Sequence, residues 1–119
     1  MSLIALVDDE EELVGELKQI LESRGHTVVT ATEGNEGLAL ILKTRPGLVI
    51  LDLKMPGLSG LKILEQAKQH EPGLKVLMLT GYLDEDSRKQ ALQLGALAVL
   101  GKPIGFEEFD QAVRDALKR

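Results

Sequence analysis

The chain has 119 residues, of which 44% are hydrophobic and 28% charged, the size and composition of one compact domain with its own core. Its 14 Lys and Arg against 19 Asp and Glu leave a net charge of −5, which argues against non-specific binding to nucleic-acid phosphates. Cysteine is absent, so disulfides, thiolate chemistry and cysteine-based zinc sites are excluded. No apolar run approaches the ~20 residues that a membrane-spanning helix needs.

Short apolar runs of strand type alternate with helical patterns along the chain. The first run, 3–7, ends at two acids, and the apolar residues of 13–21 then fall on one helical stripe. A strand at 27–31 is followed by a helix through 38–42, which ends before Pro46. The remaining predicted elements are strands at 49–51, 74–79 and 96–100 and helices through 61–67, 84–94 and 106–117.

The apolar stripe of the last helix predicts which of its side chains enter the core. Phe106 and Phe109 both fall on this stripe, so both are predicted to be buried. The acids beside them fall off the stripe and are predicted to form a solvated face. These acids are Glu107, Glu108 and Asp110.

The alternation of strands and helices implies parallel pairing, right-handed crossovers and helices on both faces of the sheet. We predict an α/β fold of the flavodoxin-like, doubly wound (βα)5 type, with a five-stranded parallel sheet in the order 2-1-3-4-5. One domain is expected over 1–119, and because the chain stops directly after a helical pattern, it is compatible with a domain excised from a longer protein. In such sheets ligands bind beyond the carboxyl ends of the strands, here the first and third.

Polar residues follow the apolar strands at the edge where this site is expected. They are Asp8, Asp9, Asp52, Thr80 and Lys102. Three close carboxylates repel one another, and a hard divalent cation such as Mg²⁺ relieves the repulsion by accepting carboxylate, carbonyl and water oxygens. An acid that lies among a metal, a lysine and a hydroxyl can attack phosphorus as a nucleophile and form an aspartyl phosphate.

Five short motifs follow one another along the chain at the predicted strand ends. They are Val7-Asp8-Asp9-Glu10, Leu51-Asp52-Leu53-Lys54-Met55-Pro56 with Gly60, Leu79-Thr80-Gly81, Gly95-Ala96 and Lys102-Pro103. Each motif alone is weak, but five in this order resemble, from end to end of the chain, the receiver domain of bacterial two-component response regulators.

The resemblance implies a role for each residue of the site. Asp52 would accept a phosphoryl group from a sensor histidine kinase or a phosphotransfer protein, in a Mg²⁺-dependent reaction. Lys102 would contact the phosphoryl group, and Thr80 would move towards it on activation. The bond between Lys102 and Pro103 would be cis. The metal ligands implied are Asp8, Asp9, Asp52 and the backbone carbonyl of Lys54.

A domain of this kind is a switch rather than an enzyme, although it assists its own phosphotransfer and slowly hydrolyses its product. Phosphorylation is expected to change the surface formed by the helix 84–94, the strand 96–100 and the last helix. Through this surface the domain would contact an output domain, a target protein or, as a homodimer, a second copy of itself. The implied location is the cytoplasm, without direct contact to nucleic acid or membrane.

The chain departs from the family pattern at Val99, where the family commonly has an aromatic residue whose inward rotation accompanies the shift of Thr80. A valine has no ring to rotate, which argues against switching coupled to an aromatic side chain. Tyr82, two residues after Thr80, is hypothesised to shape access to the phosphoryl group and hence the rate of its hydrolysis.

Other interpretations stay open on the residues alone. The acids at 8–10 suit a helix N-terminus and could serve only to cap the first helix. A degenerate receiver would act only as a protein-binding module. A haloacid-dehalogenase-like phosphatase also uses a strand-end Asp and Mg²⁺, but it needs a second acid two residues later, where this chain has Lys54. A nucleotide-binding module lacks support, because no glycine-rich phosphate loop follows the first strand.

Overall fold

The computed structural model describes residues 2–81 and 84–119, in which strands and helices alternate along the whole length. The strands are β1 (Leu3–Val7), β2 (Thr27–Ala31), β3 (Leu48–Leu51), β4 (Val76–Thr80) and β5 (Ala98–Gly101). The helices are α1 (Glu11–Ser23), α2 (Gly34–Thr44), α3 (Gly60–His70), α4 (Glu85–Gln93) and α5 (Phe106–Lys118). None of the helices in the two described ranges combines the length and the apolar character needed to cross a membrane.

Neighbouring strands all pair in parallel, in the order β2-β1-β3-β4-β5, which confirms the predicted doubly wound, flavodoxin-like sheet. Two strands start later than predicted, β4 at Val76 and β5 at Ala98. The N–H of Leu74 donates to the carbonyl of Glu71 in the turn after α3, and the N–H of Ala96 donates to the carbonyl of Ala91 in the last turn of α4. Both segments are apolar because they are buried turns, which composition does not distinguish from strands.

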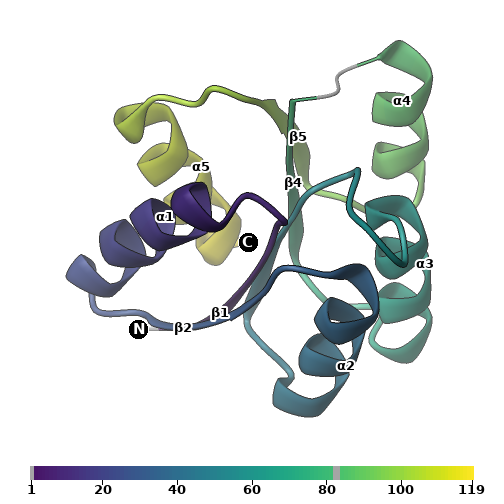
Figure 1. Ribbon diagram of the computed structural model, residues 1–119, viewed down its shortest axis with the longest axis horizontal. Helices are drawn as coiled ribbons and strands as arrows, with labels where there is room; N and C mark the ends of the chain where they lie inside the picture. Colours follow the sequence, from purple (N-terminus) through teal and green to yellow (C-terminus); the bar gives the residue numbers. More distant parts are fainter. Residues whose placement is uncertain (1, 82–83) are drawn as a thin grey trace.

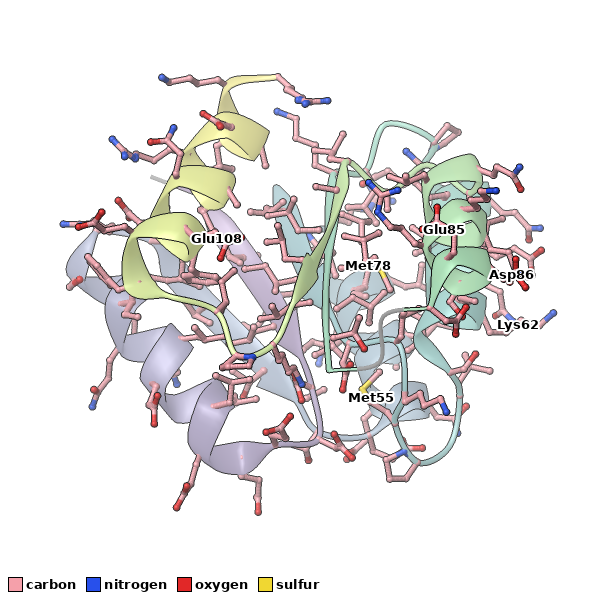
Figure 2. All side chains as sticks on the ribbon, turned by 90° about the horizontal axis from the view of Figure 1, so that it is seen from above. Met55, Lys62, Met78, Glu85, Asp86 and Glu108 are labelled. Carbon is pink, nitrogen blue, oxygen red and sulfur yellow. The ribbon has the colours of Figure 1, made fainter. Side chains whose placement is uncertain are left out.

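The sheet lies between two layers of helices (Figure 1). α1 and α5 cover one face, where Leu6 belongs to the core, and α2, α3 and α4 cover the other, where the next residue, Val7, is buried. Successive side chains of β1 thus enter opposite cores, as strand geometry requires. Figure 2 shows Met78 in the interior between the sheet and α4, whereas Lys62 and Asp86 point outwards from their helices.

Local chemistry explains where several helices begin and end. The hydroxyl of Ser59 accepts a backbone hydrogen bond at the start of α3, and the carboxylate of Asp84 accepts the N–H of Ser87 at 2.7 Å at the start of α4. α2 ends at Thr44, and its C-cap residue Arg45 adopts a left-handed conformation with φ 49°. Pro46 follows directly and cannot continue a helix, so the prediction that α2 stops before it is confirmed.

The first turn of α5 differs from the prediction. Phe109 is 1% exposed as expected, but Phe106 is 51% exposed, and the prediction that it enters the core is wrong. Its ring lies 5.4 Å from the guanidinium carbon of Arg24, the residue after α1. Asp110, predicted to be solvated, forms a 3.0 Å ion pair with the same arginine, while the two glutamates are exposed as predicted. Helical periodicity cannot show that this turn packs against the end of α1 rather than the sheet.

Replacing Phe109 by alanine is expected to lower the free energy of unfolding by about 3–5 kcal/mol, because it removes a buried ring and leaves a cavity. Phe106→Ala is the matched control, since the same change on the exposed ring removes only a cation–π contact worth about 0.5–1 kcal/mol. Urea denaturation of both variants measures the difference. Equal losses would contradict the burial found here.

Candidate functional site

Four strand ends bring the predicted polar residues to one edge of the sheet. Asp8 follows β1, Asp52 follows β3, Thr80 ends β4 and Lys102 follows β5. The parallel hydrogen bonding continues past the strands, because the N–H of Asp52 donates to the carbonyl of Val7 at 3.0 Å and that of Lys102 to the carbonyl of Thr80 at 2.8 Å. The sheet backbone therefore fixes the points from which these side chains extend.

The ammonium group of Lys102 lies at the centre of the site. Its Nζ is 2.8 Å from a carboxylate oxygen of Asp8, 2.7 Å from one of Glu10 and 3.4 Å from one of Asp52. An ammonium group carries three N–H donors, so each of them has a carboxylate within reach. Because the Lys102 side chain is largely buried, these contacts are poorly screened by water.

Two charged groups of the site, Asp52 and Lys102, have shifted pKa values. Burial, followed by the negative charge of Asp8, raises the pKa of the Asp52 carboxyl, while Lys102 and a hydrogen bond with Thr80 act in the opposite direction. Burial by itself lowers the pKa of Lys102, but hydrogen bonds to Asp8 and Glu10 and the charges of Asp8 and Asp52 outweigh it, so the pKa lies above the usual lysine value. Lys102 is therefore a permanent cation, whereas Asp52 carries its charge at a cost.

Asp8, Asp9 and Asp52 could together hold a metal ion. One carboxylate oxygen from each lies within 4.8 Å of the other two. Asp8 and Asp52 are 2% and 5% exposed, and Asp9 is exposed to solvent. The candidate site therefore combines two buried carboxylates with one that water can reach. A donor set made of carboxylate oxygens fits a hard cation such as Mg²⁺ better than a transition metal, which favours nitrogen or sulfur.

Glu10 is the residue of this site that the sequence did not reveal. It occupies the N-cap position of α1, as the capping interpretation expects, but its side chain makes no capping hydrogen bond and binds Lys102 instead. Only Asp8 fits the capping interpretation in part, because its carboxylate accepts the N–H of Glu10 at 3.0 Å. The two partners Glu10 and Lys102 are 92 positions apart, and no local pattern indicates such a contact.

The loop after Asp52 is held against the start of α2. The N–H of Gly34 donates to the carbonyl of Pro56 at 3.1 Å, and a Cβ atom at Gly34 would lie 1.9 Å from the carbonyl oxygen of Leu58. Glycine is therefore required for this close approach of helix and loop. The same loop carries Lys54, whose side chain is exposed.

Four further sequence predictions concern the neighbourhood of the site. Thr80 is buried at the end of β4, and Val99 is half-buried on β5, where it packs against the core beneath α2, α3 and α4. The peptide bond between Lys102 and Pro103 is cis, as the resemblance implies. Tyr82, for which a role in access to the site was hypothesised, lies outside the described residues.

Comparisons with known proteins agree on one family. The family model of the response regulator receiver domain matches residues 4–114. Sporulation initiation phosphotransferase F from Bacillus subtilis is 33% identical over 116 residues, which cover 98% of this chain and 90% of that protein. The alkaline phosphatase synthesis transcriptional regulatory protein PhoP from the same organism is 35% identical over 98% of this chain and 48% of its own length.

A solved structure gives the same result. A CheY-like response regulator receiver domain protein from Methanospirillum hungatei matches with a TM-score of 0.96 and 33% identity, over 99% of this chain and 94% of that one. The chain therefore belongs to the response regulator receiver domain family, a class of two-component signalling domains for which phosphorylation and Mg²⁺ are typical. Such domains are phosphoacceptor switches, generally not enzymes. The chain spans about half the length of PhoP, so it matches only part of that regulator.

Asp52→Asn is expected to raise the free energy of unfolding near neutral pH in metal-free solution. Because folding raises the pKa of Asp52 above its ordinary 3.8, its ionised form opposes folding, and a neutral isostere removes that penalty. The advantage should shrink as the pH falls towards 3.8, where the wild-type carboxyl binds its proton in the folded state.

Urea denaturation in the presence of EDTA, across this pH range, measures the effect. Glu108→Gln is a suitable control, because it removes one charge from an exposed position on the last helix. An Asp52→Asn variant that is less stable than wild type near neutral pH would show that the contact with Lys102 outweighs burial.

Proposed function

We propose that this receiver domain accepts a phosphoryl group on Asp52 from a sensor histidine kinase or phosphotransfer protein. The observation that carries the proposal is the convergence of a buried carboxylate, a buried hydroxyl and a permanently charged lysine on one sheet edge beside two further acids. Burial and the charge of Asp8 oppose the ionised form of Asp52, and conversion to an acyl phosphate moves the charge outwards onto the phosphoryl oxygens.

The proposed reaction transfers the phosphoryl group from a histidine nitrogen to a carboxylate oxygen. An Oδ atom of Asp52 attacks phosphorus, the P–N bond breaks, and its electron pair returns to the imidazole nitrogen of the donor. The Lys102 ammonium and the Thr80 hydroxyl offer hydrogen bonds to the phosphoryl oxygens, where charge is spread in the transition state. The domain thus assists its own phosphotransfer and, with water as acceptor, slowly hydrolyses the product.

Mg²⁺ is the metal that the acidic residues fit. The proposed ligands are Asp8, Asp9, Asp52 and the backbone carbonyl of Lys54. When bound, this cation neutralises negative charge on the carboxylates and on the phosphoryl group. The packing of the loop after Asp52 against Gly34 supports the proposal, because Pro56 and Leu58 hold the loop that carries Lys54 against the start of α2.

The proposed output is a change of the surface formed by α4, β5 and α5. A phosphoryl group adds negative charge and acceptor oxygens beside Thr80 and Lys102, which belong to the ends of β4 and β5. A shift of these ends alters the population of conformations of the adjacent helices, and through them contact with an output domain, a target protein or a second copy. Because β5 carries Val99 where the family commonly has an aromatic residue, we propose that the conformational change proceeds without the rotation of an aromatic ring. We also propose that the protein is cytoplasmic.

Two alternatives are less well supported. A degenerate receiver that only binds proteins would not need Asp8, Asp9, Asp52, Thr80 and Lys102 together at one edge. A haloacid-dehalogenase-like phosphatase is not favoured, because Lys54 occupies the position of its second acid and the comparisons identify a receiver.

Incubation with Mg²⁺ and acetyl phosphate, a small-molecule phosphodonor, is expected to add one phosphoryl group to the wild-type protein, and none to Asp52→Asn. Intact-mass spectrometry measures the addition. Glu108→Gln, an exposed change of the same kind, should label like wild type. Wild type that stays unmodified, or Asp52→Asn that labels equally well, would refute the phosphoacceptor proposal.

Mg²⁺ is expected to raise the melting temperature of the wild-type protein, because a ligand that binds only the folded state stabilises it by mass action. Each variant is compared with and without the metal, so that its own baseline cancels. Asp8→Asn should lose most of the Mg²⁺-dependent increase, whereas Glu12→Gln on the first turn of α1 should keep it. An undiminished increase in Asp8→Asn would contradict the proposed ligand set.

A further inference from the structure

Lys102 has more carboxylate partners than its proposed role needs. Asp8 and Asp52 lie at strand ends and belong to the metal and phosphoryl site, but Glu10 has no part in that chemistry. Its oxygen is nevertheless 2.7 Å from Nζ, the shortest of the three distances. With every N–H donor of the ammonium facing a carboxylate, a phosphoryl oxygen can bind Lys102 only if one of these partners leaves.

Glu10 is the partner that can leave at least cost. The side chains of Asp8 and Asp52 are 3% and 6% exposed, so either would be left without water if it lost the lysine. The side chain of Glu10 is 58% exposed and would be hydrated on release. Glu10 also lines an open groove of about 430 Å³ together with Leu13 and Ile104, which leaves its carboxylate room to move.

We propose that Glu10 is a resting-state counterion of Lys102, which is exchanged for a phosphoryl oxygen when Asp52 is phosphorylated. In the resting state it neutralises the lysine and withholds one donor from the phosphodonor. In the phosphorylated state the lysine turns to the phosphoryl group, and Glu10 moves into solvent. Glu10 is thus a positioning residue that acts through Lys102, an inference that rests on the proposed function of Asp52.

The exchange predicts that Glu10 slows phosphotransfer. Glu10→Gln removes the charge, and Glu10→Asp keeps the charge but is one methylene shorter, so the 2.7 Å contact is lost unless Lys102 or the backbone moves to restore it. Both variants are expected to be phosphorylated by acetyl phosphate and Mg²⁺ faster than wild type, by about two- to fivefold, the effect of losing one partly exposed ion pair. Intact mass as a function of time, at low donor concentration, gives the rates.

A second measurement does not depend on turnover. Beryllium trifluoride binds carboxylates as an analogue of a phosphoryl group, and its affinity in the presence of Mg²⁺ can be followed by NMR titration. Both Glu10 variants should bind it more tightly than wild type by about the same factor, since the same ion pair no longer competes. Glu12→Gln, which makes the same charge change on the exposed first turn of α1, should match wild type in both measurements.

The outcomes separate the exchange from other roles of Glu10. If Glu10→Asp behaves like wild type while Glu10→Gln is faster, only the local charge matters, and the exchange is refuted. Slower phosphorylation of both variants would mean that Glu10 holds Lys102 in its productive position, which also refutes it. If wild type itself takes up no phosphoryl group, the proposed function fails and the inference with it. If wild type labels and both variants match it, only the exchange fails.

Discussion

The structure depends on one ammonium group that offsets the repulsion among the acids of the carboxyl edge. Asp8 and Asp52 are buried close to each other, and the charge of Asp8 raises the pKa of Asp52. Lys102 contacts both acids and Glu10 as well. Without this shared cation the repulsion between the two buried acids would be offset only by protons or by another cation, so the lysine lowers the cost of bringing them together.

The parallel sheet makes this arrangement rigid. Hydrogen bonds of the sheet extend past β3 and β5 to the backbone of Asp52 and Lys102, so neither residue begins in a free loop. The loop after Asp52 is fixed in turn by its approach to Gly34. Groups held in this way would need little reorganisation during the proposed phosphoryl transfer, a reaction in which positioning and charge supply most of the catalysis.

The balance of charges also explains how the edge can work as a switch. A buried acid whose pKa is raised by its surroundings is sensitive to any group that changes its charge. Thr80 and Lys102, the neighbours proposed to respond, lie at the ends of the two strands beside the proposed output surface. A local change of charge can therefore bias the α4, β5 and α5 side of the domain without a change of fold.

Much of the fold could be predicted because the relevant signals are local. Apolar runs and helical stripes indicated the elements, and their alternation indicated parallel pairing. The predicted starts of β4 and β5 lay two residues too early, because apolar buried turns precede Val76 and Ala98. The five polar residues at the strand ends followed from the same topology. Phe106 was misjudged because its helical spacing does not reveal which neighbour lies above it.

By itself the sequence determined the order of elements, the parallel sheet and the set of acids, hydroxyl and lysine at its carboxyl edge, because periodicity and strand ends are properties of short segments. Only the tertiary structure decided that Glu10 binds Lys102 rather than capping α1, and that Arg24 joins Phe106 and Asp110. These contacts join residues far apart in the chain, and their geometry exists only after the helices have packed on the sheet.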